Sequence, residues 1–153
     1  MSKILDEIDR NILRKLQKDA SVSIEQLADS INLSRNACWR RVKRLESDGI
    51  ITKRIAVVDP DSLSLGLAVF VMIKAFGHDP DWLGKFKSAI SSMPEIIGAH
   101  RMSGDLDYVL RVRVSDVKAY DEFYQRLISK IPVADISASF VMEDIKDTTS
   151  LPI

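Results

Sequence analysis

The sequence has no long apolar run and almost no cysteine. Its longest uninterrupted apolar stretch, residues 67–73, is far shorter than the roughly 20 residues needed to cross a bilayer. Charged side chains at Lys3, Asp6 and Glu7 occupy the positions where a signal peptide would carry its apolar segment. The single cysteine, Cys38, excludes an intrachain disulfide. We therefore expect a cytoplasmic protein, not a membrane or secreted one.

The chain also lacks a net charge, because 22 lysines and arginines balance 22 aspartates and glutamates. The distribution is uneven: residues 1–60 carry 12 basic and 9 acidic side chains, and residues 61–153 carry 10 and 13. Residues 34–54 alone contain seven basic and two acidic side chains. A dense positive patch in a neutral chain is the electrostatic footprint expected of nucleic-acid binding.

Motifs of catalysis and metal binding are absent as well. The sequence contains no glycine-rich phosphate loop, no nucleophile elbow and no pair of catalytic carboxylates. Neither of the two histidines, His78 and His100, has a second histidine, cysteine or carboxylate at a metal-ligand spacing. We therefore predict no metal, no cofactor and no enzymatic activity. His78 is expected in a surface loop and His100 in a structural role.

The first 50 residues have the pattern of three helices. The first helix begins with an acidic turn, Asp6, Glu7 and Asp9, where negative charge suits the helix dipole. Ser23 and Gln26 form a capping box for a short second helix. Ser34 is a suitable N-cap for a third helix, which ends at Gly49. Because the second and third helices are joined by a brief turn, we predict that residues 1–50 form a winged helix-turn-helix domain.

The third helix has one apolar side and one basic side. With Cys38 pointing inward, Val42 and Leu45 lie on the same stripe. This position favours a small buried Cys38 over a redox switch. The outward side carries Asn36, Arg40 and Lys43, flanked by Trp39 and Arg44.

These outward side chains suit a DNA major groove. Asparagine and arginine can read adenine and guanine, and we expect the base readers among Asn36, Trp39 and Arg40. The helix N-terminus suits phosphates, and Lys53 and Arg54 can reach an adjacent one. The alternative is an ordinary solvated basic face; the helix-turn-helix spacing and the charge concentration favour DNA. The predicted DNA-binding residues are Ser34, Arg35, Asn36, Trp39, Arg40, Lys43, Arg44 and Lys53.

After Gly49 the pattern changes to that of strands. Residues 51–58 are rich in β-branched side chains, and we take residues 51–66 as a linking strand and hinge. Within the C-terminal domain, residues 67–153, the order of elements is βαββαβ, which describes a ferredoxin-like sandwich. The expected strands are 67–76, 96–102, 107–114 and 136–142, and the expected helices are 79–93 and 117–131. The fold class is therefore α+β.

The uncovered face of this sheet needs a partner. Ala68, Phe70 and Met72 alternate with inward residues of the first strand. Leaving three or four such side chains in water forgoes several kcal/mol, at roughly 25 cal/mol per Å² of apolar area. We predict that the sheets of two copies pack face to face in a homodimer; the alternative is that the N-terminal domain covers the strand.

Four segments carry a family resemblance. They are "LDEIDRNILRKLQKDA", "LADSINLSRNACWRRVKRLESDGII", "GDLDYVLRV" and "MEDIKDTTSLPI". They resemble the opening helix, the helix-turn-helix, the effector-domain glycine and Asp-Tyr motif, and the tail of the Lrp/AsnC (leucine-responsive and asparagine-synthesis, or feast/famine) transcriptional regulators. "NACWRRVKRLESDGI", "YDEFYQRL" and "TTSLPI" are similar, more narrowly, to the branch that senses cysteine and switches on its detoxification.

The resemblance implies a sequence-specific regulator of double-stranded operator DNA. Its oligomeric DNA binding would be modulated by a small amino-acid effector, with dimers assembling to tetramers or octamers. Effectors of the family bind near the turn between the second and third strands of the effector domain. Gly104 allows a close backbone approach, and Asp105 or Asp107 can accept from an ammonium group. The implied effector-binding residues are Met102, Gly104, Asp105, Asp107, Tyr108, Ser137 and Ser139; the alternative for the turn is a plain hairpin.

Two other functions are compatible with the architecture. A branch of similar proteins decarboxylates sirohaem, a tetrapyrrole, using histidines in a cleft between subunits. The outward basic side chains of the third helix argue against such an enzyme, which has no need of them. The second alternative is a ligand-binding module whose DNA domain is vestigial.

Overall fold

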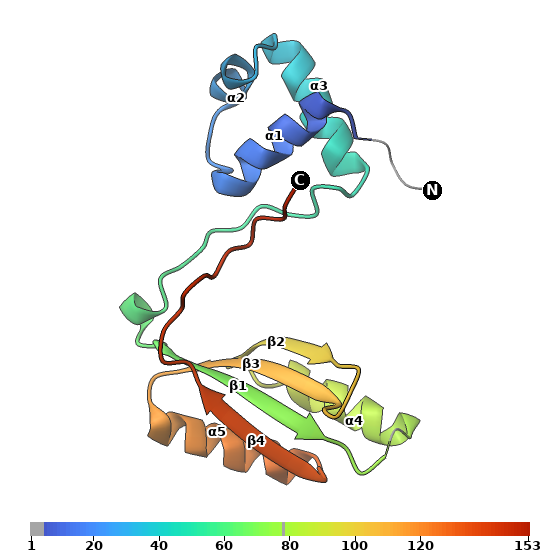
Figure 1. Cartoon of the computed structure of the whole chain (residues 1–153), viewed down its shortest axis with the longest axis vertical. Helices are drawn as coiled ribbons and strands as arrows, with labels where there is room; N and C mark the ends of the chain where they lie inside the picture. The colour runs from blue at the N-terminus through green and yellow to red at the C-terminus, as the bar shows by residue number, and fades with distance from the viewer. Residues whose placement is uncertain (1–4, 78) are drawn as a thin grey trace. The chain divides into compact units, whose positions relative to one another are not determined.

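The computed structural model describes residues 5–77 and 79–153 (Figure 1). The chain divides into two compact units, Met1–Val57 with Lys146–Ile153, and Val58–Ile145. The polypeptide therefore passes from one unit to the other twice. None of the described helices is long and apolar enough to cross a membrane.

The first unit contains three helices, α1 (Glu7–Lys18), α2 (Ile24–Ser30) and α3 (Arg35–Ser47). Their starts are the expected ones: Ser23 and Gln26 form a capping box on α2, and the Ser34 hydroxyl accepts the Ala37 N–H. Helix α3 ends at Ser47, and Gly49 follows its C-cap Asp48 with a φ of 71°, which glycine adopts easily. The three-helix prediction is confirmed.

One apolar core joins the three helices. Cys38 is fully buried in it, as expected, and burial raises the pKa of its thiol. The core side chains come from every helix: Ile12, Leu13, Leu27, Ala28, Cys38, Val42 and Leu45. Because α3 contributes its whole apolar stripe, its opposite side faces outward.

The segment expected as a linking strand has no strand partner. Residues 52–59 form neither helix nor ladder, and a short 3₁₀ helix, η1 (Asp61–Leu63), follows. A strand requires hydrogen bonds to a neighbour, and the described part of this chain provides none for this segment. The strand prediction at 51–58 is therefore wrong for the isolated chain.

Residues 146–153 belong to the first unit, although the sequence pattern placed them with the C-terminal domain. The Gln17 side chain accepts the Leu151 N–H at 2.6 Å and donates to the Leu151 carbonyl at 3.2 Å. Arg14 Nε donates to the Ile153 main-chain oxygen at 2.5 Å, and Ile153 packs against the core of α1, α2 and α3. These contacts join residues far apart in sequence, so periodicity could not indicate them.

The second unit is a four-stranded antiparallel sheet in the order β2-β3-β1-β4. Central strand β1 pairs Val71 with Leu110 of β3 and with Ala138 of β4. Two helices cover one face (Figure 1), and their apolar sides close a core with the inward residues of β1 and β3. The elements are β1 (Leu67–Lys74), α4 (Pro80–Ser91), β2 (Ile96–Arg101), β3 (Tyr108–Val114), α5 (Val117–Lys130) and β4 (Asp135–Phe140). The predicted βαββαβ sandwich is confirmed.

The other face of this sheet carries no helix among the described elements of the second unit (Figure 1). Phe70 lies on it, opposite Arg111 of β3 and Ser139 of β4, and is 41% exposed. Met72 lies two residues further along β1, on the same face, opposite Val109 and Ser137. We call this the open sheet face. It carries the apolar row that the alternation in β1 predicted.

Candidate nucleic-acid interface

The outward side of α3 presents three uncommitted side chains. Asn36, Trp39 and Arg40 are exposed, Trp39 by 51%, and stand three and four residues apart on adjacent turns. Within residues 5–77 and 79–153 none of the three has an ion pair or a side-chain hydrogen bond. We call these residues the reading face. They are an amide, an indole and a guanidinium; the amide and the guanidinium are groups that pair with base edges in a major groove.

Two cations that flank the reading face each form an ion pair with one carboxylate. Arg35 Nε lies 2.5 Å from Glu25 Oε1, and Lys43 Nζ lies 2.9 Å from Glu46 Oε2. Hydrogen bonding from Lys43 lowers the pKa of Glu46. Both cations are more than half-exposed, and ion pairs of exposed cations contribute little to stability because water and salt screen them. Both cations can therefore exchange their carboxylate for a phosphate at small cost.

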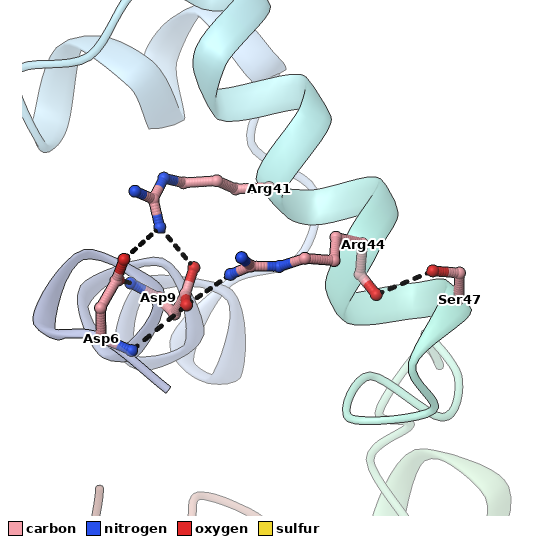
Figure 2. A network of polar contacts seen from close by, with 5 residues as sticks. All are labelled: Asp6, Asp9, Arg41, Arg44 and Ser47. Atoms are coloured by element: carbon pink, nitrogen blue, oxygen red, sulfur yellow. Dashed lines mark hydrogen bonds and ion pairs between the residues drawn. The ribbon is translucent and has the colours of Figure 1, made fainter. Parts of the chain in front are cut away.

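Arg44, a third cation of the predicted DNA-binding set, pairs with a buried carboxylate. Arg44 Nη2 lies 2.5 Å from Asp9 Oδ2, and Arg41 Nη1 lies 2.9 Å from Asp9 Oδ1. Figure 2 shows both guanidinium groups reaching from α3 to the start of α1. Asp9 is only 1% exposed, so this contact belongs to the packing of the helices. The structure thus ties Arg44, whose own side chain is half-exposed, to the buried carboxylate of Asp9.

Asp6 completes this network at the N-terminus of α1. Its carboxylate accepts the Asp9 N–H at 2.8 Å and lies 2.6 Å from Arg41 Nη1. Both hydrogen bonds lower the pKa of Asp6. The hydrogen bonds from Arg41 to Asp6 and to Asp9 raise the pKa of the Arg41 guanidinium. Sequence reasoning assigned the acidic turn to the helix dipole and did not anticipate Arg41 or Asp9. The pairing of one buried carboxylate with two arginines 32 and 35 residues later is visible only in the folded unit.

The remaining predicted DNA contacts lie at the ends of α3. Ser34 is the N-cap, and its hydroxyl accepts the Ala37 N–H at 3.3 Å. Lys53 is exposed beyond Gly49, and Arg54 lies 3.1 Å from Glu46. Lys53 is therefore accessible to a DNA phosphate, whereas the Ser34 hydroxyl is used to cap α3.

The predicted effector turn connects β2 and β3. Gly104 has a φ of 119°, which requires glycine, and Asp105 and Met102 are exposed. Asp107 Oδ2 accepts the Ala75 N–H at 2.8 Å, and its own N–H donates to Ile73. The Asp107 carboxylate thus anchors the end of β1.

Tyr108 is not part of the turn surface. Its ring is 6% exposed, and its centroid lies 4.5 Å from that of Phe86 and 5.7 Å from that of Trp82. Tyr108 begins β3 on the inward side, because alternation from Leu110 turns it toward α4. The expectation that its side chain meets an effector has no support in this chain, where the ring belongs to the core.

The two serines of β4 are not brought to the turn within one chain. Ser137 and Ser139 lie on the open sheet face, and β1 separates their strand from β3. His100 lies on β2 opposite Val109 of β3 and is exposed. His78 lies outside the described residues.

Comparison with protein families matches both units. A model described as winged helix-turn-helix DNA-binding matches residues 5–52, and one described as Lrp/AsnC ligand binding domain matches residues 68–151. The DNA-binding transcriptional activator DecR of Escherichia coli (strain K12) is 48% identical over 151 residues, covering 98% of this chain and 99% of that protein.

Two solved structures resemble the whole chain closely. An AsnC family transcriptional regulator from Agrobacterium tumefaciens has a TM-score of 0.93 and 46% identity, covering 97% of each chain. A transcriptional regulator from Neisseria meningitidis in complex with L-Met has a TM-score of 0.93 and 33% identity, again covering 97% of each chain. The similarity extends over both units of the chain.

Proposed function

Because the chain belongs to the Lrp/AsnC family of transcriptional regulators, we propose that it binds operator DNA through the reading face of α3. The observation that carries this proposal is that Asn36, Trp39 and Arg40 are exposed together and uncommitted. An apolar stripe seats α3 on the other two helices, so the reading face is presented on a rigid support. Major-groove recognition requires this combination.

Phosphate contacts are assigned to the loosely paired cations. Arg35 and Lys43 leave Glu25 and Glu46 for the DNA backbone, and Lys53 contributes from beyond the helix. Such contacts position the protein without reading sequence. The reading face then discriminates between base pairs, with Arg40 suited to guanine and Asn36 to adenine.

Arg40→Ala is expected to weaken binding to a duplex taken from upstream of the protein's own gene by about 1–3 kcal/mol and to relax sequence discrimination. The reason is that Ala removes a bidentate donor from the reading face. Fluorescence anisotropy over a range of salt concentrations measures both effects. Lys18→Ala, which removes an exposed cation at the end of α1, is the matched control and is expected to bind like the wild type. An Arg40→Ala variant with unchanged affinity would remove Arg40 from the interface.

We also propose that two copies pair through the open sheet face. Phe70 and Met72 lie at its centre, and Phe70 stays 41% exposed in the single chain. Burying this apolar row releases water at roughly 25 cal/mol per Å². A homodimer carries two α3 helices, which suits operators with two half-sites. Further assembly to tetramers or octamers is the arrangement we expect from the family.

Phe70→Lys is expected to convert the dimer to a monomer at micromolar concentration. A charge buried in an apolar interface without a partner opposes association. Sedimentation velocity measures the change. Phe76→Lys makes the same substitution at a phenylalanine that is 74% exposed outside the strands, and this control is expected to stay dimeric. A Phe70→Lys dimer, or a wild-type monomer, would contradict pairing through this face.

The effector is proposed to be a small amino acid, with cysteine the first candidate. The left-handed Gly104 and the exposed Asp105 offer a main-chain approach for a carboxylate and an acceptor for an ammonium group. The L-Met complex of the Neisseria meningitidis relative supports this ligand class. Ser137 and Ser139 reach such a site from another copy, because one chain keeps them apart from the turn.

Thermal unfolding in the presence of each common amino acid tests this effector proposal. A ligand at 100 times its dissociation constant adds about 2.7 kcal/mol of stability. We expect one small amino acid to raise the unfolding midpoint of the wild type and of Asp121→Asn, an exposed acidic control on α5. Asp105→Asn is expected to lose the response, because it lacks the negative acceptor. If no amino acid shifts the wild type, or if Asp105→Asn responds normally, the assignment fails.

A non-catalytic role and a cytoplasmic location complete the proposal. Both structural relatives and DecR are transcriptional regulators. The exposed cations and the reading face on α3 have a use on DNA and none in tetrapyrrole chemistry. DNA binding places the protein in the compartment that holds the chromosome.

A further inference from the structure

Asp9 is the one buried charged residue in the described part of the chain. A carboxylate in an apolar core is costly unless opposite charges and hydrogen bonds compensate for its lost hydration. Here Oδ1 faces Arg41 at 2.9 Å, Oδ2 faces Arg44 at 2.5 Å, and Oδ2 also accepts the Asp6 N–H at 3.3 Å. Both oxygens are therefore satisfied by groups from two helices.

The network fixes α3 at two points. Arg41 and Arg44 are three residues apart and leave α3 on consecutive turns, and both reach the first turn of α1 (Figure 2). Two contacts along the axis restrain both the rotation of a helix and its tilt. Arg44 stands one turn after Arg40, on nearly the same side of α3. The arginine one turn beyond Arg40 is thus held by Asp9.

We propose that Asp9 is a positioning residue for DNA recognition, acting through Arg41 and Arg44 to aim the reading face. This inference rests on the proposed DNA-binding function and deepens it. Arg44 then has its role in the internal network and binds no phosphate. The phosphate contacts are left to the exposed cations Arg35 and Lys43.

The Arg44–Asp9 and Arg35–Glu25 pairs differ in the burial of their carboxylates. This difference supports a positioning role for Arg44 and a phosphate-binding role for Arg35. Arg44 is itself 50% exposed, but its partner is 1% exposed. If Arg44 moved to a phosphate, Asp9 would lose one of its two cations inside the core, which is costly. Glu25 is 56% exposed, so water hydrates it when Arg35 leaves.

The test compares Asp9→Asn, Arg44→Gln and the double variant with the wild type in binding to the upstream duplex and to a random duplex of equal length. We expect each single variant to bind the upstream duplex roughly tenfold more weakly, a loss typical of one displaced base contact. Binding to the random duplex and the slope of log affinity against log salt are expected to stay unchanged. The double variant is expected to be no weaker than either single variant, because both break the same contact.

The opposing model makes Arg44 a phosphate ligand that Asp9 restrains. It predicts that Asp9→Asn binds both duplexes more tightly with a steeper salt slope, and that Arg44→Gln lowers the slope by about one. Either result overturns the inference. An Asp9→Asn variant with wild-type affinity and discrimination also overturns it while leaving the proposed function standing. A wild-type protein that binds no duplex overturns the proposed function itself.

Two further variants, Arg44→Lys and Asp29→Asn, distinguish an effect on the orientation of the reading face from an effect on folding. Arg44→Lys keeps a cation for Asp9 but loses the planar fork, so we expect a folded protein with intermediate discrimination. Asp29→Asn removes an exposed carboxylate from α2 and is expected to match the wild type in every readout. Binding is measured below the unfolding transition of each variant, where a purely structural role leaves the discrimination between duplexes unchanged. Full discrimination in a folded Arg44→Lys variant that has lost the Asp9 contact contradicts the inference.

Discussion

The need to compensate the buried carboxylate of Asp9 constrains the whole N-terminal unit. Asp9 caps α1 together with Asp6 and at the same time holds two arginines of α3. The apolar stripe fixes which side of α3 faces the core, and these ion pairs fix its axis against α1. Recognition depends on this constraint, because a reading face is specific only when its orientation is set before binding.

The basic residues around α3 consequently divide into three roles, although they form one dense patch in sequence. Arg40 is exposed and uncommitted and stands with Asn36 and Trp39. Arg35 and Lys43 are exposed cations, and their partners Glu25 and Glu46 are less buried than Asp9. Arg41 and Arg44 are tied to Asp9. Net charge alone would count all five cations equally as DNA contacts, whereas the burial of their partners distinguishes positioning from binding.

Local chemistry predicted most of the fold and only part of the site. Caps at Ser23 and Ser34, and alternation along β1, depend on neighbours in sequence and located their elements correctly. The roles of Arg44 and Tyr108 depend on tertiary partners, an acidic turn 35 residues earlier and an aromatic cluster on α4. The strand expected at 51–58 had the right residue types but lacks a partner strand in one chain, and the docking of residues 146–153 on α1 left no periodic pattern.

The central claim is that the reading face enters the major groove of a duplex, in pairs carried by a dimer. Cleavage of DNA by a reagent attached to Asn36→Cys tests it most directly, since Cys38 is fully buried and the new thiol is the reactive one. The account predicts two clusters of cuts about one helical turn apart on the upstream duplex. A reagent at Lys18→Cys should not reproduce them. Absence of localised cuts from position 36, or the same pattern from both positions, would contradict the account.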